Sequence, residues 1–188
     1  LSGIYWGVPC KLGKGGLEDT LQSARAALAN ASDAAGKRQA LITLRQGLAS
    51  GSADEAAGAI WRFLDAKVDA ATGQGFKPGG GGSLAEAPTL RTFLLDQLGR
   101  LDPAAAAAYA RVVLSEMNSP DEWAVALRNL AAGDTSAAGR ALLEQKLAEL
   151  LRYEPWHDGG VRLPAPATWQ IAIGAAIVGP AIQFTDWM

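Results

Sequence analysis

Helix-capping signals recur at short, regular intervals in the second half of the chain. Asp102-Pro103 and Ser119-Pro120 each place a side-chain acceptor directly before a proline, an arrangement typical of helix starts. We expect a third cap at Thr135, so that the starts follow one another after 17 and 16 residues. Helices of about three turns joined by tight loops must lie antiparallel to their neighbours. The spacing therefore predicts short antiparallel helices packed side by side.

The apolar residues of this half recur at helical spacing. A helix with Pro88 in its first turn is expected to bury Leu90, Phe93, Leu94, Leu98 and Leu101. Glu122 follows the Ser119 cap three residues later, which is the capping-box pattern. After Thr135, the residues predicted to be buried are Leu142, Leu143, Leu147, Leu150 and Leu151.

Three more helices are predicted in the first half of the chain. One runs from Leu17 to about Asn30, and the next runs from about Asp33 to Ala49. A third begins after a cap at Ser52, where Glu55 completes a capping box, and is expected to continue to Thr72.

A glycine-rich segment separates the two groups of helices. Residues 79–82 are four successive glycines, which lose more backbone entropy on ordering than other residues do. We therefore predict a flexible linker over residues 73–87. A first helical block with an N-terminal arm (1–72) precedes it, and a second block with an apolar C-terminal segment (88–188) follows it. The predicted fold class is all-α, with short antiparallel helices stacked as an α–α superhelix or an irregular helical repeat bundle.

Charge and composition argue against several classes of function. The chain is 49% hydrophobic and 19% charged, as globular proteins are, and its net charge is −2. Because there is no basic excess, we expect no nucleic-acid partner. Cys10 and His157 are the single cysteine and the single histidine, which excludes an internal disulfide and most metal sites. The glycine motifs lack the features of nucleotide-binding loops, so we predict neither a cofactor nor a metal.

The C-terminal segment raises the question of a membrane anchor. No residue between Leu163 and Thr185 is charged, and residues 169–184 are mostly apolar. Prolines and glycines cut the strongly apolar part to roughly ten residues, which is too short to span a bilayer. We therefore favour a buried terminal helical unit over a membrane or interfacial anchor. Leu1 is not an initiator methionine and no signal peptide is visible, so we expect a processed or trimmed start. The compartment of this soluble chain, cytoplasmic or periplasmic, stays open.

One predicted loop contains residues that a scaffold does not need. It combines Glu154, Trp156, His157 and Asp158. An enzyme would use His157 as a general base, oriented by Asp158 or Glu154. No nucleophile motif such as Gly-x-Ser-x-Gly accompanies this loop, and Cys10 lies far from it in the sequence. We favour an exposed loop whose tryptophan packs back onto the helices, and we predict no catalytic residue.

Arginines of the second half form another candidate site. Arg91, Arg128 and Arg140 are most simply solvent-facing or capping cations. On stacked helices such cations would provide an interaction face for another protein. Trp61 and Trp123 lie among leucines and alanines at amphipathic spacing, and we expect both in the core.

Two segments of the chain resemble each other. Residues 40–51 and 124–133 share a Leu-Arg step and a small-residue ending, and each precedes a capped, alanine-rich helix. Residues 119–133, with the sequence Ser-Pro-Asp-Glu-Trp-Ala-Val-Ala-Leu-Arg-Asn-Leu-Ala-Ala-Gly, resemble the helices of HEAT and armadillo α-solenoids, especially degenerate bacterial ones. The resemblance covers residues 88–151 and, more weakly, residues 17–72. It implies protein–protein interaction or scaffolding.

The expected function is therefore that of a protein-interaction or scaffold module of the helical-repeat type, whose partner is another protein. The alternative is a helical hydrolase or ligand-binding domain that uses the His157 loop. A third interpretation makes the chain the soluble part of a membrane-associated protein anchored near its C-terminus.

Overall fold

The computed structural model describes residues 16–153, and the fold is all-α, as predicted. The described helices are α1 (Gly16–Asn30), α2 (Ala34–Ala49), α3 (Ala53–Asp65), α4 (Leu90–Leu101), α5 (Pro103–Val113), α6 (Pro120–Gly133) and α7 (Ala137–Arg152). Between α3 and α4 lie two short strands and a single 3-10 turn, named β1 (Lys77–Pro78), η1 (Gly80–Gly82) and β2 (Leu84–Glu86).

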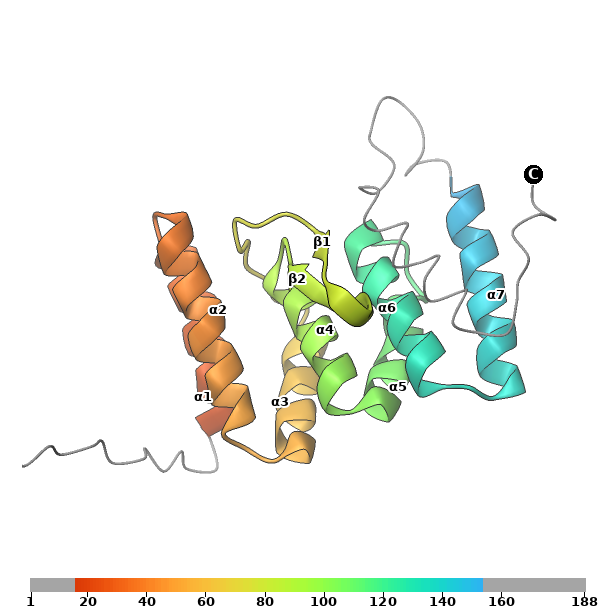
Figure 1. Ribbon diagram of the computed structural model, residues 1–188, viewed down its shortest axis with the longest axis horizontal. Coiled ribbons are helices and arrows are strands. Elements are labelled where there is room, and N and C mark those ends of the chain that lie inside the picture. Colours follow the sequence, from red (N-terminus) through yellow and green to blue (C-terminus); the bar gives the residue numbers. More distant parts are fainter. Residues whose placement is uncertain (1–15, 154–188) are drawn as a thin grey trace, which may run out of the picture.

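The helices stand side by side in a row, with α1 and α2 at one end and α7 at the other (Figure 1). Short connections send α4, α5, α6 and α7 back and forth along this row, as the spacing of the caps predicts (Figure 1). The ends of α3 and α5 and the starts of α4 and α6 consequently lie at the same edge of the row (Figure 1). The candidate site forms at this edge.

Three predicted caps are confirmed, and a fourth is wrong by a residue. The side chains of Ser52, Asp102 and Ser119 accept hydrogen bonds from the third residue of their helices. The predicted cap at Thr135 is instead Ser136, whose hydroxyl accepts from the Gly139 N–H. The reason is local, because the Asp134 carboxylate accepts the Ser136 N–H at 3.1 Å and turns the chain there.

Helix α3 is shorter than the sequence pattern predicts. It ends at Asp65 rather than Thr72, and Lys67 then takes a φ of 51°. Beyond this turn, main-chain bonds join Leu90 N–H to Ala70 C=O (2.9 Å) and Thr72 N–H to Pro88 C=O (3.0 Å). Long-range pairing therefore replaces the last predicted turns of the helix. Pro88 lies before the helix start, since Thr89 is the cap of α4.

The glycine-rich segment is a hairpin, which differs from the flexible linker that we expected. Strands β1 and β2 pair in antiparallel fashion with Lys77 opposite Glu86, and the Gly79 N–H donates to Ser83 C=O at 2.6 Å. Backbone entropy opposes this order, but side chains of α4 and α6 bind the main chain of the hairpin, as described below. The hairpin lies across α4 (Figure 1).

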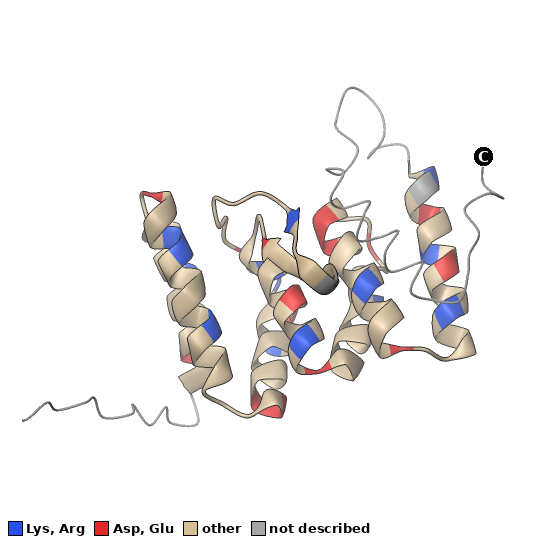
Figure 2. Cartoon of the chain, in the orientation of Figure 1, with Lys and Arg blue, Asp and Glu red and all other residues tan. Residues whose placement is uncertain are grey.

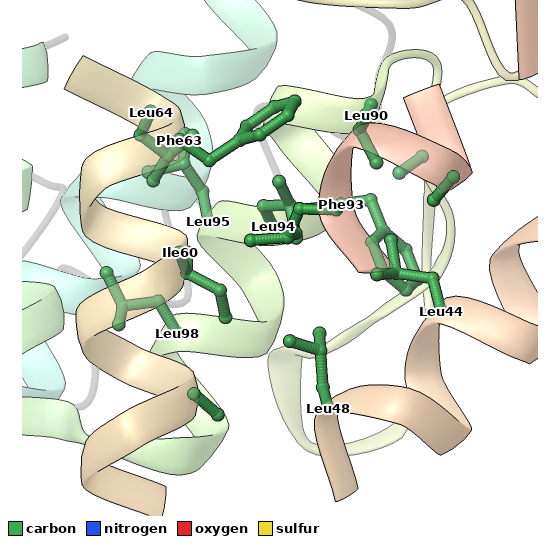
Figure 3. Packing of buried hydrophobic residues seen from close by; sticks show 14 of the residues in the cluster. Leu44, Leu48, Ile60, Phe63, Leu64, Leu90, Phe93, Leu94, Leu95 and Leu98 are labelled. Carbon is green, nitrogen blue, oxygen red and sulfur yellow. The ribbon is translucent and has the colours of Figure 1, made fainter. Parts of the chain in front are cut away.

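A single apolar cluster extends from α1 to α6 and includes residues from both sides of the hairpin. Helix α4 is at its centre, with seven consecutive residues buried from Thr92 to Leu98. Figure 3 shows leucines of α2 and apolar residues of α3 meeting this helix. In a helix buried on all sides, each polar side chain needs hydrogen-bond partners within the protein. Asp96 is such a side chain. A second cluster joins α5, α6 and α7, with Trp123 fully buried in it.

Candidate functional site

A cleft of about 210 Å³ opens where the ends of α3, α4, α5 and α6 meet, and we call it the four-helix cleft. Its apolar walls come from Val112, Val113 and Trp123, and its polar groups come from Arg91, Glu122, Lys67 and Glu116. The lining is completed by Tyr109, Asn118 and Ser119.

Local sequence shapes both sides of this cleft. On one side, the left-handed backbone of Lys67 ends α3 and places this lysine at the rim. On the other side, α5 ends at Val113 and the Ser119 cap starts α6, so a short loop crosses the edge of the row. The indole N–H of Trp123 donates to Glu116 C=O at 2.7 Å and fixes this loop against α6.

The floor of the cleft holds an ion pair that is mostly covered. Arg91 Nε and Nη2 donate to the two carboxylate oxygens of Glu122 at 2.8 and 3.1 Å, and the two side chains are 14% and 13% exposed. Arg91 Nη1 also donates to the last turn of α3, at Leu64 C=O (2.6 Å). Burial alone would lower the pKa of Arg91, but the hydrogen bonds and charge of Glu122 outweigh it, so the pKa is raised. This pair joins α3, α4 and α6.

Tyr109 lies beside the ion pair and is itself buried. Burial raises the pKa of its phenol, and the positive charge of Arg91 offsets this effect only in part. Its ring contacts Trp61 edge-on, with centroids 5.0 Å apart and planes at 80°. Tyr109 therefore remains a neutral phenol and connects the cleft to the packing of α3 on α5.

The rim carries a weaker pair. Lys67 Nζ lies 3.4 Å from Glu116 Oε1, and both side chains are exposed. A hydrogen bond from Asn118 (2.6 Å) and the interaction with Lys67 lower the pKa of Glu116. Exposed pairs of this kind contribute little to stability, so both rim charges can exchange partners at low cost.

The charged groups on the floor of the cleft are engaged with each other. Both charges on the floor of the cleft are neutralised by each other, so neither serves as a free general acid or base. Within residues 16–153, no group of three His, Cys, Asp or Glu side chains is placed to hold a metal ion. What the cleft offers is an apolar wall beside paired charges, which suits an aliphatic or aromatic side chain with a polar neighbour.

A second polar site lies further along α4, and we call Asp96, Arg100 and Arg128 the Asp96 cluster. Asp96 Oδ1 accepts from Arg128 Nη1 at 2.5 Å, and Oδ2 accepts from Arg100 Nε at 3.0 Å. Arg128 also donates to Asn129 Oδ1, whose amide donates to Leu95 C=O at 2.9 Å. Asp96 is fully buried, and the hydrogen bonds of the cluster compensate for the lost hydration of its carboxylate.

The structure places the predicted arginine face differently from our expectation. Arg91 and Arg128 are largely covered and form internal ion pairs, so they are not solvent-facing cations. Arg140 is exposed and donates to Thr135 C=O of its own helix start at 2.7 Å. Trp123 is in the core as expected, whereas Trp61 is half-buried.

The candidate loop with Glu154, Trp156, His157 and Asp158 lies outside the described residues, as does Cys10.

Sequence reasoning missed most residues of both sites. Arg91 and Glu122 are 31 residues apart, and no local pattern connects them. Glu122 matched a capping box, but its carboxylate binds Arg91 instead. Asp96 and Arg100 did carry a signal, because opposite charges four residues apart lie on one helix face.

Comparison of the chain with protein-family models, with curated proteins and with solved structures finds no match. Among the helices between residues 16 and 153, none combines the length and the apolar character that crossing a membrane requires. Positions of Lys and Arg and positions of Asp and Glu both occur along the row of helices (Figure 2).

Proposed function

We propose that this chain is a protein-interaction module of stacked helices, and that the four-helix cleft receives an apolar side chain of its partner. The observation that carries the proposal is the exposure of Val112, which is 48% accessible at the wall of the cleft. Among the described residues, Ile42 is comparably exposed at 46%, and it lies on α2, outside the cleft lining. An accessible apolar wall beside a concave space is typical of a binding site.

The size of the cleft supports one anchoring side chain. A closed apolar cavity of about 150 Å³ holds a benzene-sized group, and the volume of this cleft is about 210 Å³. A stable protein interface needs roughly 1,000 Å² or more, so the anchor would be one part of a larger contact. The row of helices offers such a surface, and the sequence resemblance to HEAT and armadillo helices supports the same class of function.

The proposal is tested with a display library of random peptides selected on the intact chain. Selected peptides should share an aliphatic or aromatic residue and should bind the Val112→Asp variant at least tenfold more weakly. A buried valine contributes about 1.5–3 kcal/mol, and a charge at its place removes that contribution. Dissociation constants are measured by calorimetry.

Ile42→Asp is the matched control, because it places the same charge on an equally exposed apolar position. It should leave peptide affinity unchanged. Peptides that bind Val112→Asp as tightly as the intact chain, or a selection that enriches no peptide, would count against the cleft as the interaction site.

A further inference from the structure

The glycine-rich hairpin is held to the helices through its main chain. Asp96 Oδ1 accepts the Leu84 N–H at 2.9 Å, and Arg100 Nη2 donates to Leu84 C=O at 3.3 Å. Arg128 Nη1 donates to Gly82 C=O at 2.8 Å. Side chains of α4 and α6 thus bind an extended segment in the way that a neighbouring strand would.

These three bonds are independent of the side chains that the bound segment carries. Leu84 adds the apolar contact, since it is 5% exposed and belongs to the main core cluster. Its neighbours Ser83 and Ala85 are partly or fully exposed. The site therefore recognises an extended main chain that carries one aliphatic side chain at a defined position.

The hairpin is a weak occupant of this site. Its glycine run must lose more backbone entropy than any other sequence would when it is ordered. Gly82 has a φ of 77°, a conformation that glycine adopts readily and other residues resist. The glycines that allow the hairpin to form therefore also make its ordering entropically unfavourable.

Departure of the hairpin would leave no buried charge unpaired. Asp96 would lose the Leu84 N–H but keep both Arg100 and Arg128. The Asp96 cluster can therefore persist when the segment above it has left, and its free donors and acceptor would then face solvent.

We propose that the hairpin is a strap that opens locally, and that the uncovered Asp96 cluster binds an extended main-chain segment of a partner protein. The segment carries an aliphatic residue at the position of Leu84 and displaces the chain's own hairpin. This site is separate from the four-helix cleft, so Val112→Asp should not change binding to it.

Native-state hydrogen exchange of the intact chain tests the opening. The Leu84 amide should exchange at least a hundredfold faster than the Leu94 amide of the α4 interior, with little dependence on denaturant. Exchange of both amides at one common rate, set by global unfolding, would overturn the proposal.

A peptide added in trans tests the binding. The probe is the blocked peptide Gly-Gly-Gly-Ser-Leu-Ala-Glu-Ala, which matches residues 80–87. Its affinity for the Leu84→Asp variant, followed by NMR shifts of the Arg100 and Arg128 side chains, should exceed its affinity for the intact chain at least tenfold. The same peptide with aspartate in place of leucine is the control and should not bind.

The intact chain provides a second readout that needs no substitution. Millimolar amounts of the leucine peptide should lower the exchange protection of the Leu84 amide, because peptide and hairpin compete for one site. Equal binding of the two peptides, or protection that no peptide changes, would refute displacement.

Discussion

Lys67 adopts a backbone conformation that normally selects glycine. Its φ of 51° follows the end of α3, where a left-handed residue commonly closes a helix. For a residue with a side chain, this backbone conformation costs roughly 1 kcal/mol of stability. The exposed ion pair with Glu116 offsets little of this cost. The strained residue lines the four-helix cleft, and strain of this kind often accompanies a functional role.

Lys67→Gly should accordingly raise the free energy of unfolding by about 0.5–1 kcal/mol, because it relieves the strain and loses only an exposed pair. Urea denaturation measures the change. Lys67→Ala is the control, since it removes the same pair but keeps the strain, and it should not stabilise the chain. Stabilisation by both variants alike would show that the lysine side chain, and not the backbone, is unfavourable.

At the scale of elements, the end of α6 closely approaches the start of α5. A Cβ atom built on Gly133 would lie 1.9 Å from the carbonyl oxygen of Pro103, so main chain meets main chain there. Gly58 lies within α3, and a Cβ there would meet only the end of the Arg62 side chain, at 3.6 Å. A methyl group therefore has room at Gly58 but not at Gly133.

Gly133→Ala is expected to destabilise the chain by about 2 kcal/mol or more, because α5 and α6 must move apart. Gly58→Ala should stabilise it by roughly 0.5–1 kcal/mol through helix propensity alone. Thermal unfolding followed by circular dichroism compares the two variants. A neutral Gly133→Ala variant would mean that the α5–α6 contact is looser than described.

Helix starts could be predicted from the sequence because their causes are local. The Asp102 and Ser119 caps bind residues three positions away, and a short window of sequence contains all of the information. The end of α3 could not be predicted, because it depends on pairing between Ala70 and Leu90 across the hairpin. The Arg91–Glu122 pair was missed for the same reason.

At the scale of the whole molecule, α4 is the central helix of the main apolar cluster. It contacts α3, α5, α6 and the hairpin, and Arg45 of α2 lies 5.3 Å over the ring of its Phe93. The all-α class followed from composition and periodicity, but the central position of α4 did not. The predicted linker at 73–87 placed α4 in a different block from α1, α2 and α3. The main apolar cluster instead contains residues from both sides of this segment.

Leu94→Ala should therefore weaken both halves of the row together. Removal of a fully buried leucine costs about 2–5 kcal/mol, and the loss should appear equally in the exchange protection of Leu44 in α2 and Leu127 in α6. Reduced protection of Leu127 alone would instead indicate two blocks that unfold independently.

The late position of α4 in the chain has a consequence during synthesis. Helices α2 and α3 bury their apolar faces against a helix that ends at Leu101, although α3 itself is complete at Asp65. At about 5–20 residues per second, a ribosome needs roughly 2–7 seconds to make the intervening stretch. For that time the nascent N-terminal helices present uncovered leucines, so this protein is expected to need chaperone protection at the ribosome more than after release.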